Sequence, residues 1–127
     1  MRYSPLLLLA VPVLACAMSF EERVNAGYTS SESKLGRDYE ASIGLFIGKV
    51  MRKCMPMNLP DNFSTEDFTL VSWVDDTGHV MKPDVQPSSA LSNCFLTEFS
   101  KMDLPSPPKS GKQVEGYPLT IYMKIAE

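Results

Sequence analysis

The chain has 127 residues, of which 44% are hydrophobic and 21% are charged. This length fits a single domain, and the composition is that of a folded protein, which excludes a collagen-like or wholly disordered chain. Twelve basic residues against fifteen acidic ones give a net charge of -3. This acidic balance excludes a protein built to hold nucleic acid, which needs a basic stripe.

The first 17 residues have the pattern of a secretory signal peptide. Met1-Arg2 gives a charged start, residues 6–14 are almost wholly apolar, and the small residues of Ala15-Cys16-Ala17 follow. The uncharged stretch over residues 5–18 is too short to cross a bilayer, since a spanning helix needs about 20 apolar residues. The pattern therefore predicts export with loss of residues 1–17, and no retained membrane anchor.

Two processing sites are open. Ala15 and Ala17 fit the Ala-x-Ala rule, which starts the mature chain at Met18. The stretch from Val13 to Cys16 also resembles a bacterial lipobox, in which Cys16 carries the lipid and becomes the new N-terminus. This resemblance favours a lipoprotein of the periplasm. Because Ala17 is not the aspartate that commonly retains lipoproteins at the inner membrane, the resemblance implies the outer membrane.

Residues 18–32 are predicted to be a flexible tether that leads into a folded domain over residues 33–127. Small and polar residues dominate the stretch from Glu21 to Arg37, and its few apolar side chains follow no period. Such a composition is typical of a linker or of a disordered tail, and both alternatives stay open.

Two cysteines remain once Cys16 is assigned to the signal or the lipid. In an oxidising compartment, Cys54 and Cys94 are expected to form a disulfide. A separation of 40 residues corresponds to about 4 kcal/mol of stabilisation in the chain-entropy model. The alternative, a thiolate pair on a metal, is weak without the close spacing of metal-binding cysteines.

The folded part begins with a predicted helix and hairpin. Residues 33–54 have apolar side chains spaced by three and four, which is typical of one helix face. Gly44 and Gly48 on this helix are expected to pack tightly on the protein's own sheet. Two apolar runs, residues 67–76 and 79–87, are joined by a turn. Pro83 in the second run has no N–H to donate, which places that strand at a sheet edge.

A second helix and a last strand complete the domain. Ser88 or Ser89 is expected to cap the helix. A proline-rich stretch over residues 104–108 ends it as a stiff connector. Residues 117–125 alternate between apolar and polar side chains, which predicts a half-buried strand. The predicted buried stripe of the second helix consists of Leu91, Cys94, Phe95, Phe99 and Met102.

Short motifs in these elements resemble the TonB C-terminal-like domains. Residues 75–80, Asp-Asp-Thr-Gly-His-Val, are similar to the Asp-x-x-Gly-x-Val at the end of the first strand in those domains. Residues 85–89, Val-Gln-Pro-Ser-Ser, are similar to the return strand that runs into Ser-Ser. Cys94-Phe95, Leu104-Pro105 and Gly116-Tyr117-Pro118-Leu119 look like the branch whose helix carries a cysteine. Residues 67–125 keep the family's order of strand, strand, helix and strand.

The resemblance implies a β-β-α-β unit, which together with the helix predicted over residues 33–54 gives an α+β fold. The three strands would form a small antiparallel sheet packed on the helix, with the first strand in the middle. In TonB itself this domain binds a segment of an outer-membrane receptor by strand addition. The chain lacks TonB's retained anchor and long proline-rich spacer, so energy coupling is not expected to carry over.

The sequence favours a non-catalytic module that binds a protein or peptide segment of the cell envelope. It has no nucleophile elbow or phosphate loop, and its sole histidine, His79, lies beside a turn that also explains Asp75 and Asp76. No cofactor and no catalytic residue are expected. The free edge of the last strand can pair with a peptide, although a solvated strand face would look the same. The candidate partner contacts are Tyr117, Thr120, Tyr122 and Lys124.

Two other functions stay open. A small exported protein with a disulfide can also be an inhibitor or immunity protein that blocks a secreted toxin. A copper-binding protein is the other alternative, because Met51, Met55 and Met57 surround Cys54 and thioethers, with the imidazole of His79, suit Cu(I). Methionine is also a common filler of hydrophobic cores, which weakens this alternative.

Overall fold

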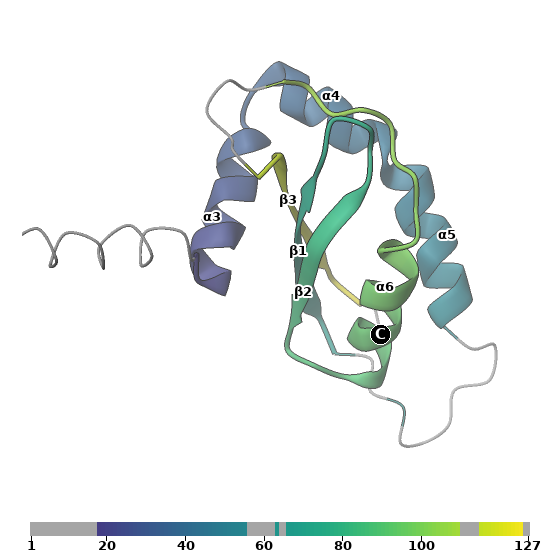
Figure 1. Cartoon of the computed structure of the whole chain (residues 1–127). Coiled ribbons are helices and arrows are strands. Elements are labelled where there is room, and N and C mark those ends of the chain that lie inside the picture. Colours follow the sequence, from purple (N-terminus) through teal and green to yellow (C-terminus); the bar gives the residue numbers. More distant parts are fainter. Residues whose placement is uncertain (1–17, 56–62, 64–65, 110–114, 126–127) are drawn as a thin grey trace, which may run out of the picture.

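The computed structural model describes residues 18–55, 63, 66–109 and 115–125. The described strands form one antiparallel sheet in the order β2–β1–β3 (Figure 1). The predicted α+β class, the β-β-α-β order and the central first strand are therefore confirmed. The elements in chain order are α3 (Phe20–Ser30), α4 (Lys34–Ser42), α5 (Gly44–Cys54), β1 (Phe68–Val74), β2 (Val80–Gln86), α6 (Ala90–Phe99) and β3 (Tyr117–Met123).

The signal peptide and the lipidation site at Cys16 lie outside the described residues. Within the part of the chain that the structure describes, no helix is both long enough and apolar enough to span a bilayer.

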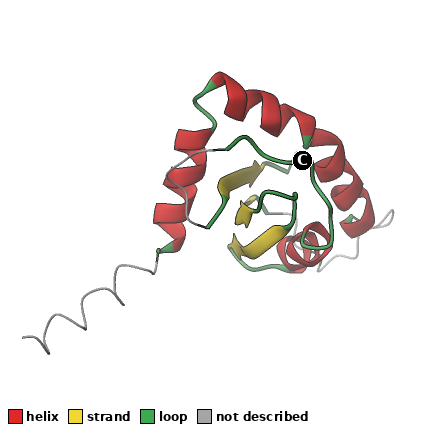
Figure 2. Ribbon diagram, turned by 45° about the horizontal axis from the view of Figure 1, so that its top comes forward, coloured by secondary structure: helices red, strands yellow, loops and turns green. Residues whose placement is uncertain are grey.

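Helices cover both faces of the sheet. With the strands seen nearly end-on, α3 lies on one side of the sheet, and α5 and α6 lie on the other (Figure 2). We call the α3 side the outer face and the α5–α6 side the inner face. The hydrophobic core fills the inner face. Its most deeply buried side chains include Val50, Leu70, Leu91, Phe95, Phe99 and Leu119.

The helix predicted over residues 33–54 is two helices that meet at Ile43. This residue closes α4 and opens α5 with φ -91° and ψ 0°, and its side chain is buried in the core. The expectation that Gly44 and Gly48 pack on the sheet is wrong. A Cβ at Gly44 would meet no atom within 4 Å, and one at Gly48 would meet only the Arg52 side chain at 3.6 Å. The core-facing side of α5 carries Val50 instead.

Residues 20–30 form α3, so the prediction of a flexible tether over residues 18–32 is wrong. Ser19 starts the helix with a capping box. Its hydroxyl accepts from the Glu22 N–H at 3.1 Å, and its own N–H donates to the Glu22 carboxylate at 2.8 Å. The only residue of α3 that is fully buried is Gly27. The helix lacks an apolar period because it approaches the sheet closely through this glycine rather than through large side chains.

A disulfide ties α5 to α6. Cys54 and Cys94 are bonded with an S–S distance of 2.11 Å, as the sequence predicted. Of the two serines expected to cap α6, Ser89 does so: its hydroxyl accepts from the Ser92 N–H at 3.0 Å. Inside the core, the Phe95 ring meets Phe68 of β1 edge-on, with ring centroids 5.4 Å apart.

Candidate functional site

The β2 edge of the sheet offers few free backbone donors. Pro83 has no N–H, and the N–H of Val85 donates to the Asp84 carboxylate at 2.9 Å. Lys82 has a φ of +49° at an irregularity in the β1–β2 ladder, and its carbonyl accepts a hydrogen bond from Arg23 of α3 at 2.6 Å. Such features protect an edge strand against pairing with another chain. The edge position predicted for this strand is confirmed.

On β3, every second residue directs its backbone groups to the open edge. The Asp75 N–H donates to the His79 carbonyl at 3.0 Å, so odd-numbered residues of β1 bond to β2 and even-numbered residues bond to β3. Leu70 of β1 stands opposite Ile121 of β3, and Ile121 therefore turns its backbone groups inward. The residues of β3 that turn theirs outward are Pro118, Thr120 and Tyr122.

Helix α3 covers this edge at Thr120. Gly27 lies so close that a Cβ on it would be 2.0 Å from the Thr120 Oγ1 and 2.7 Å from the Thr120 backbone nitrogen. The Thr120 hydroxyl donates to the Val24 carbonyl at 3.1 Å, and the residue is only 7% exposed. Since Pro118 has no N–H, the outward donor that remains accessible along β3 is the N–H of Tyr122.

The exposed end of β3 is held in place by Asp67, which comes just before β1. The Tyr122 hydroxyl donates to Asp67 Oδ2 at 3.0 Å, and the Ile125 N–H donates to Oδ1 at 2.7 Å. These hydrogen bonds, from Ile125 foremost, hold the pKa of Asp67 below its usual range. The carboxylate is therefore ionised at neutral pH. Its hydrogen bond raises the pKa of Tyr122, so this phenol keeps its proton.

Of the four predicted contact residues, Tyr122 and Lys124 are exposed, whereas Tyr117 and Thr120 are buried. Tyr117 does not reach the surface, because it is two residues before Leu119 and so shares the core face of β3. Thr120 does point to the outer face, but α3 lies over it. Because residues 18–32 were predicted to be a flexible tether, a helix at this place was not expected.

Two residues at this end of β3 could not be predicted from the sequence. Asp67 was assigned only to the start of the first strand, but antiparallel pairing of β1 with β3 brings that start to the end of the last strand. Tyr28 follows Gly27 on α3 and is 46% exposed. Nothing in the sequence marked it, because the segment was expected to be unstructured.

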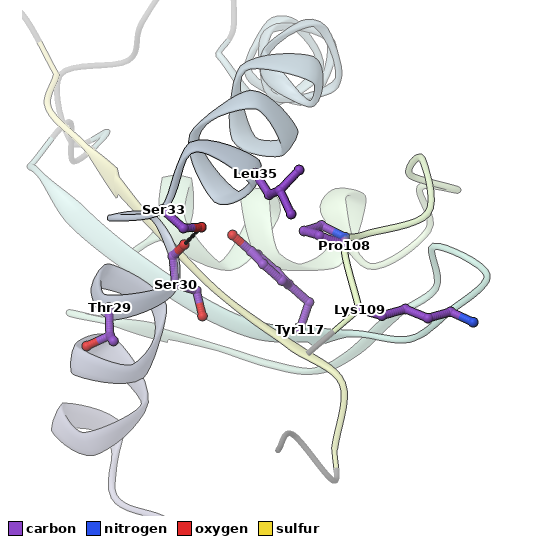
Figure 3. A pocket seen from close by; sticks show the side chains of 7 residues that line it. All are labelled: Thr29, Ser30, Ser33, Leu35, Pro108, Lys109 and Tyr117. Carbon is purple, nitrogen blue, oxygen red and sulfur yellow. Dashed lines mark hydrogen bonds between the residues drawn. The ribbon is translucent and has the colours of Figure 1, made fainter. Parts of the chain in front are cut away.

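A cavity of about 260 Å³ lies at the opposite end of β3 (Figure 3). Leu35 and Pro108 face each other beside the Tyr117 ring, while Lys109 points away. The Tyr117 hydroxyl donates to the Glu40 carboxylate at 2.9 Å, and burial raises the pKa of Glu40. The remaining lining side chains carry hydroxyls: Thr29 and Ser30 are the last residues of α3, and Ser33 is the N-cap of α4. This lining suggests no particular reaction.

The copper hypothesis gains no support from the described residues. Met51 and Met55 are partly buried against the hydrophobic core, and Met57 lies outside the described residues. The His79 Nδ1 is 2.7 Å from the Thr77 hydroxyl. In the described ranges, no group of three His, Cys, Asp or Glu side chains is placed to hold a metal ion.

Comparison of the chain with known protein families, with curated proteins and with solved structures found no match.

Proposed function

We propose that this chain is an exported, non-catalytic module of the bacterial cell envelope, and that it binds a partner protein by adding an extended segment of that partner to the β3 edge at Tyr122. The observation that carries the proposal is the contrast between the two edges. β2 is protected by Pro83, Asp84 and the contact of Arg23 with Lys82. β3 keeps an outward backbone position at Tyr122, a residue that is 53% exposed.

The resemblance to TonB C-terminal-like domains supports the same mode of binding. The sheet order, with β1 in the middle and β3 at an edge, is the order that this resemblance implies. An outer-face helix such as α3 was not among the features it implied. In this proposal α3 restricts the edge, so that a partner segment pairs at the Tyr122 end and not along the whole strand.

The open part of the edge is short. The Tyr122 N–H and C=O can make two backbone hydrogen bonds, which contribute about 1–3 kcal/mol in all. Micromolar affinity needs about 8 kcal/mol. Side chains next to Tyr122 must therefore supply most of the binding free energy.

The test is site-specific photo-crosslinking in intact cells, with the full chain carrying a photoreactive amino acid in place of Tyr122. We expect a discrete crosslinked product from this position and none from Thr97, an exposed residue of α6. Equal products from both positions, or none from 122, would refute edge binding. The identity of the captured protein separates an envelope component from a secreted toxin, which would make the chain an inhibitor.

Backbone and side-chain contributions can then be separated at one position. Tyr122→Pro removes the outward N–H and should abolish crosslinking from a reporter placed at Lys124. Tyr122→Ala keeps the N–H and should only weaken it. Circular dichroism must show that both variants are folded. If both bind as well as the parent, the partner does not use this edge.

Anchoring by a lipid at Cys16 belongs to the same proposal. The Cys54–Cys94 disulfide is compatible with an oxidising compartment. Labelled palmitate should enter the protein, and Cys16→Ser should abolish both labelling and membrane association. A mature protein that starts at Met18 and is recovered free in the periplasm would contradict the lipid anchor.

A further inference from the structure

We infer that the partner segment carries an arginine at the position that meets Tyr122, and that its guanidinium lies against the Tyr122 and Tyr28 rings while it donates to Asp67. This inference rests on the proposed function. It names the chemistry of the segment and adds Tyr28 and Asp67 to the site.

The position of Tyr28 follows from the docking of α3. Gly27 touches Thr120 on the outer face of β3, and Tyr122 is the next residue of β3 on that same face. Tyr28 is adjacent to Gly27 and shares its side of α3 with Val24, whose carbonyl accepts from Thr120. The pKa of Tyr122 is raised mainly by its hydrogen bond to Asp67, and the electrostatic interaction with Tyr28 adds to this shift, so the two phenols are near each other. Two half-exposed rings, Tyr28 and Tyr122, are therefore placed on the same side of this part of the edge.

The Asp67 carboxylate can accept further hydrogen bonds. Its two oxygens each receive one hydrogen bond, from Tyr122 and from Ile125, whereas a carboxylate offers about four lone-pair sites. It is ionised at neutral pH, since the same bonds lower its pKa. A carboxylate beside an aromatic ring suits a planar guanidinium, which can bond the acid through its edge and stack on the ring through its face.

The charge at this end of the sheet points the same way. Among the described residues at the start of β1 and the end of β3, Glu66 and Asp67 are acidic and Lys124 is basic, which sums to -1. The Asp67 carboxylate is fixed beside the Tyr122 hydroxyl, so a cationic group of a partner that reaches Tyr122 also reaches this carboxylate. An acidic segment would instead place its charge against Asp67 and Glu66, which repels it.

The experiment uses the photoreactive residue at Lys124 in the full chain, with the crosslink yield in intact envelopes as the readout. Tyr28→Ala should lower the yield about two- to five-fold, the range expected for loss of one exposed cation–π contact. Tyr28→Phe keeps a ring and should retain the yield. Thr29→Ala, the exposed neighbour on α3, is the matched control and should leave it unchanged.

Asp67→Asn tests the charge. This variant should lower the yield and also flatten its dependence on salt between low and high ionic strength, since the attraction to a guanidinium is screened. Trp73 emission should stay that of the parent, which shows that the sheet and α3 are intact. Mass mapping of the crosslinked product should find an arginine within the captured segment.

The outcomes separate this inference from the proposed function. If the reporter at Lys124 captures a partner but Tyr28→Ala matches Thr29→Ala, or the captured segment lacks an arginine, the inference is wrong and edge binding stands. If the reporter captures nothing and position 122 captures nothing, both are wrong.

Discussion

The contact between Gly27 and Thr120 predicts a large response to one added methyl group. In Gly27→Ala, the new Cβ would lie 2.0 Å from the Thr120 Oγ1 and 2.7 Å from its backbone nitrogen. The hydroxyl can rotate away, but the nitrogen belongs to the sheet, so α3 must move. Overpacking of this kind typically costs 1–3 kcal/mol.

Two further effects accompany the clash. Moving α3 breaks the hydrogen bond from Thr120 to the Val24 carbonyl, a loss of about 1 kcal/mol. Replacing a helical glycine by alanine stabilises the helix by about 1 kcal/mol, which offsets part of this loss. The free energy of unfolding of Gly27→Ala should therefore fall by about 2 kcal/mol, which for a domain of this size lowers the melting temperature by roughly 8–16 °C.

The assay is thermal and urea unfolding followed by Trp73 fluorescence. Trp73 is the one tryptophan of the chain, it is 8% exposed, and Arg23 of α3 lies 5.6 Å from the centre of its ring. Its emission should shift to the red in Gly27→Ala as α3 moves. The exposed Asn25→Ala on the same helix is the control. A Gly27→Ala variant as stable as the parent, with unchanged emission, would refute the docking of α3.

Three other responses follow from the structure. Gly48→Ala should raise the free energy of unfolding by about 1 kcal/mol, since its Cβ would meet only the Arg52 side chain; a loss of stability in urea unfolding would mean that the glycine is needed for packing. Removal of the Cys54–Cys94 bond by paired alanines should cost about 2–5 kcal/mol, and unchanged melting would exclude the bond in the native protein. Burial raises the pKa of Glu40 above its ordinary 4.5, so the folded state holds this proton more tightly and Glu40 contributes less stability as pH rises above that value. Glu40→Gln should therefore unfold with a flatter pH dependence from there upward, and identical pH profiles for variant and parent would contradict the burial of the carboxyl.

The helices on the inner face of the sheet, α5 and α6, could be predicted from the sequence because their apolar residues recur at helical spacing. Val50 and Cys54 on α5, and Phe95 and Phe99 on α6, fall at helical spacing on the faces that form the core. Pro83 marked its strand as an edge by the absence of an N–H. In each case a local chemical property of the side chain also fixes its place in the fold.

Helix α3 on the outer face of the sheet could not be predicted in this way. α3 docks through Gly27 and through the contact of Arg23 with Trp73, and neither a glycine nor an arginine produces an apolar period. The signal that was available is the capping box of Ser19 and Glu22. It indicates a helix start even where the following residues are polar.

Only part of the candidate site could be predicted, because local alternation places some of its residues and long-range contacts place the others. Tyr122 and Lys124 could be placed on the exposed end of the last strand by alternation alone. Thr120 obeys that alternation, but its burial depends on α3. Asp67 and Tyr28 reach the site through strand register and helix docking, which are contacts between residues far apart in the sequence and leave no local pattern.

Hydrogen exchange of the β3 amides, in the free protein and in complex with the captured partner, tests edge binding most directly. In the free protein the amides of Leu119 and Ile121 should be protected by β1, Thr120 should be slowed by α3, and Tyr122 should exchange fast. The complex should protect Tyr122 strongly and leave Leu119 and Ile121 as they were. A complex in which Tyr122 still exchanges fast, with new protection on α5 or α6 instead, would contradict the account.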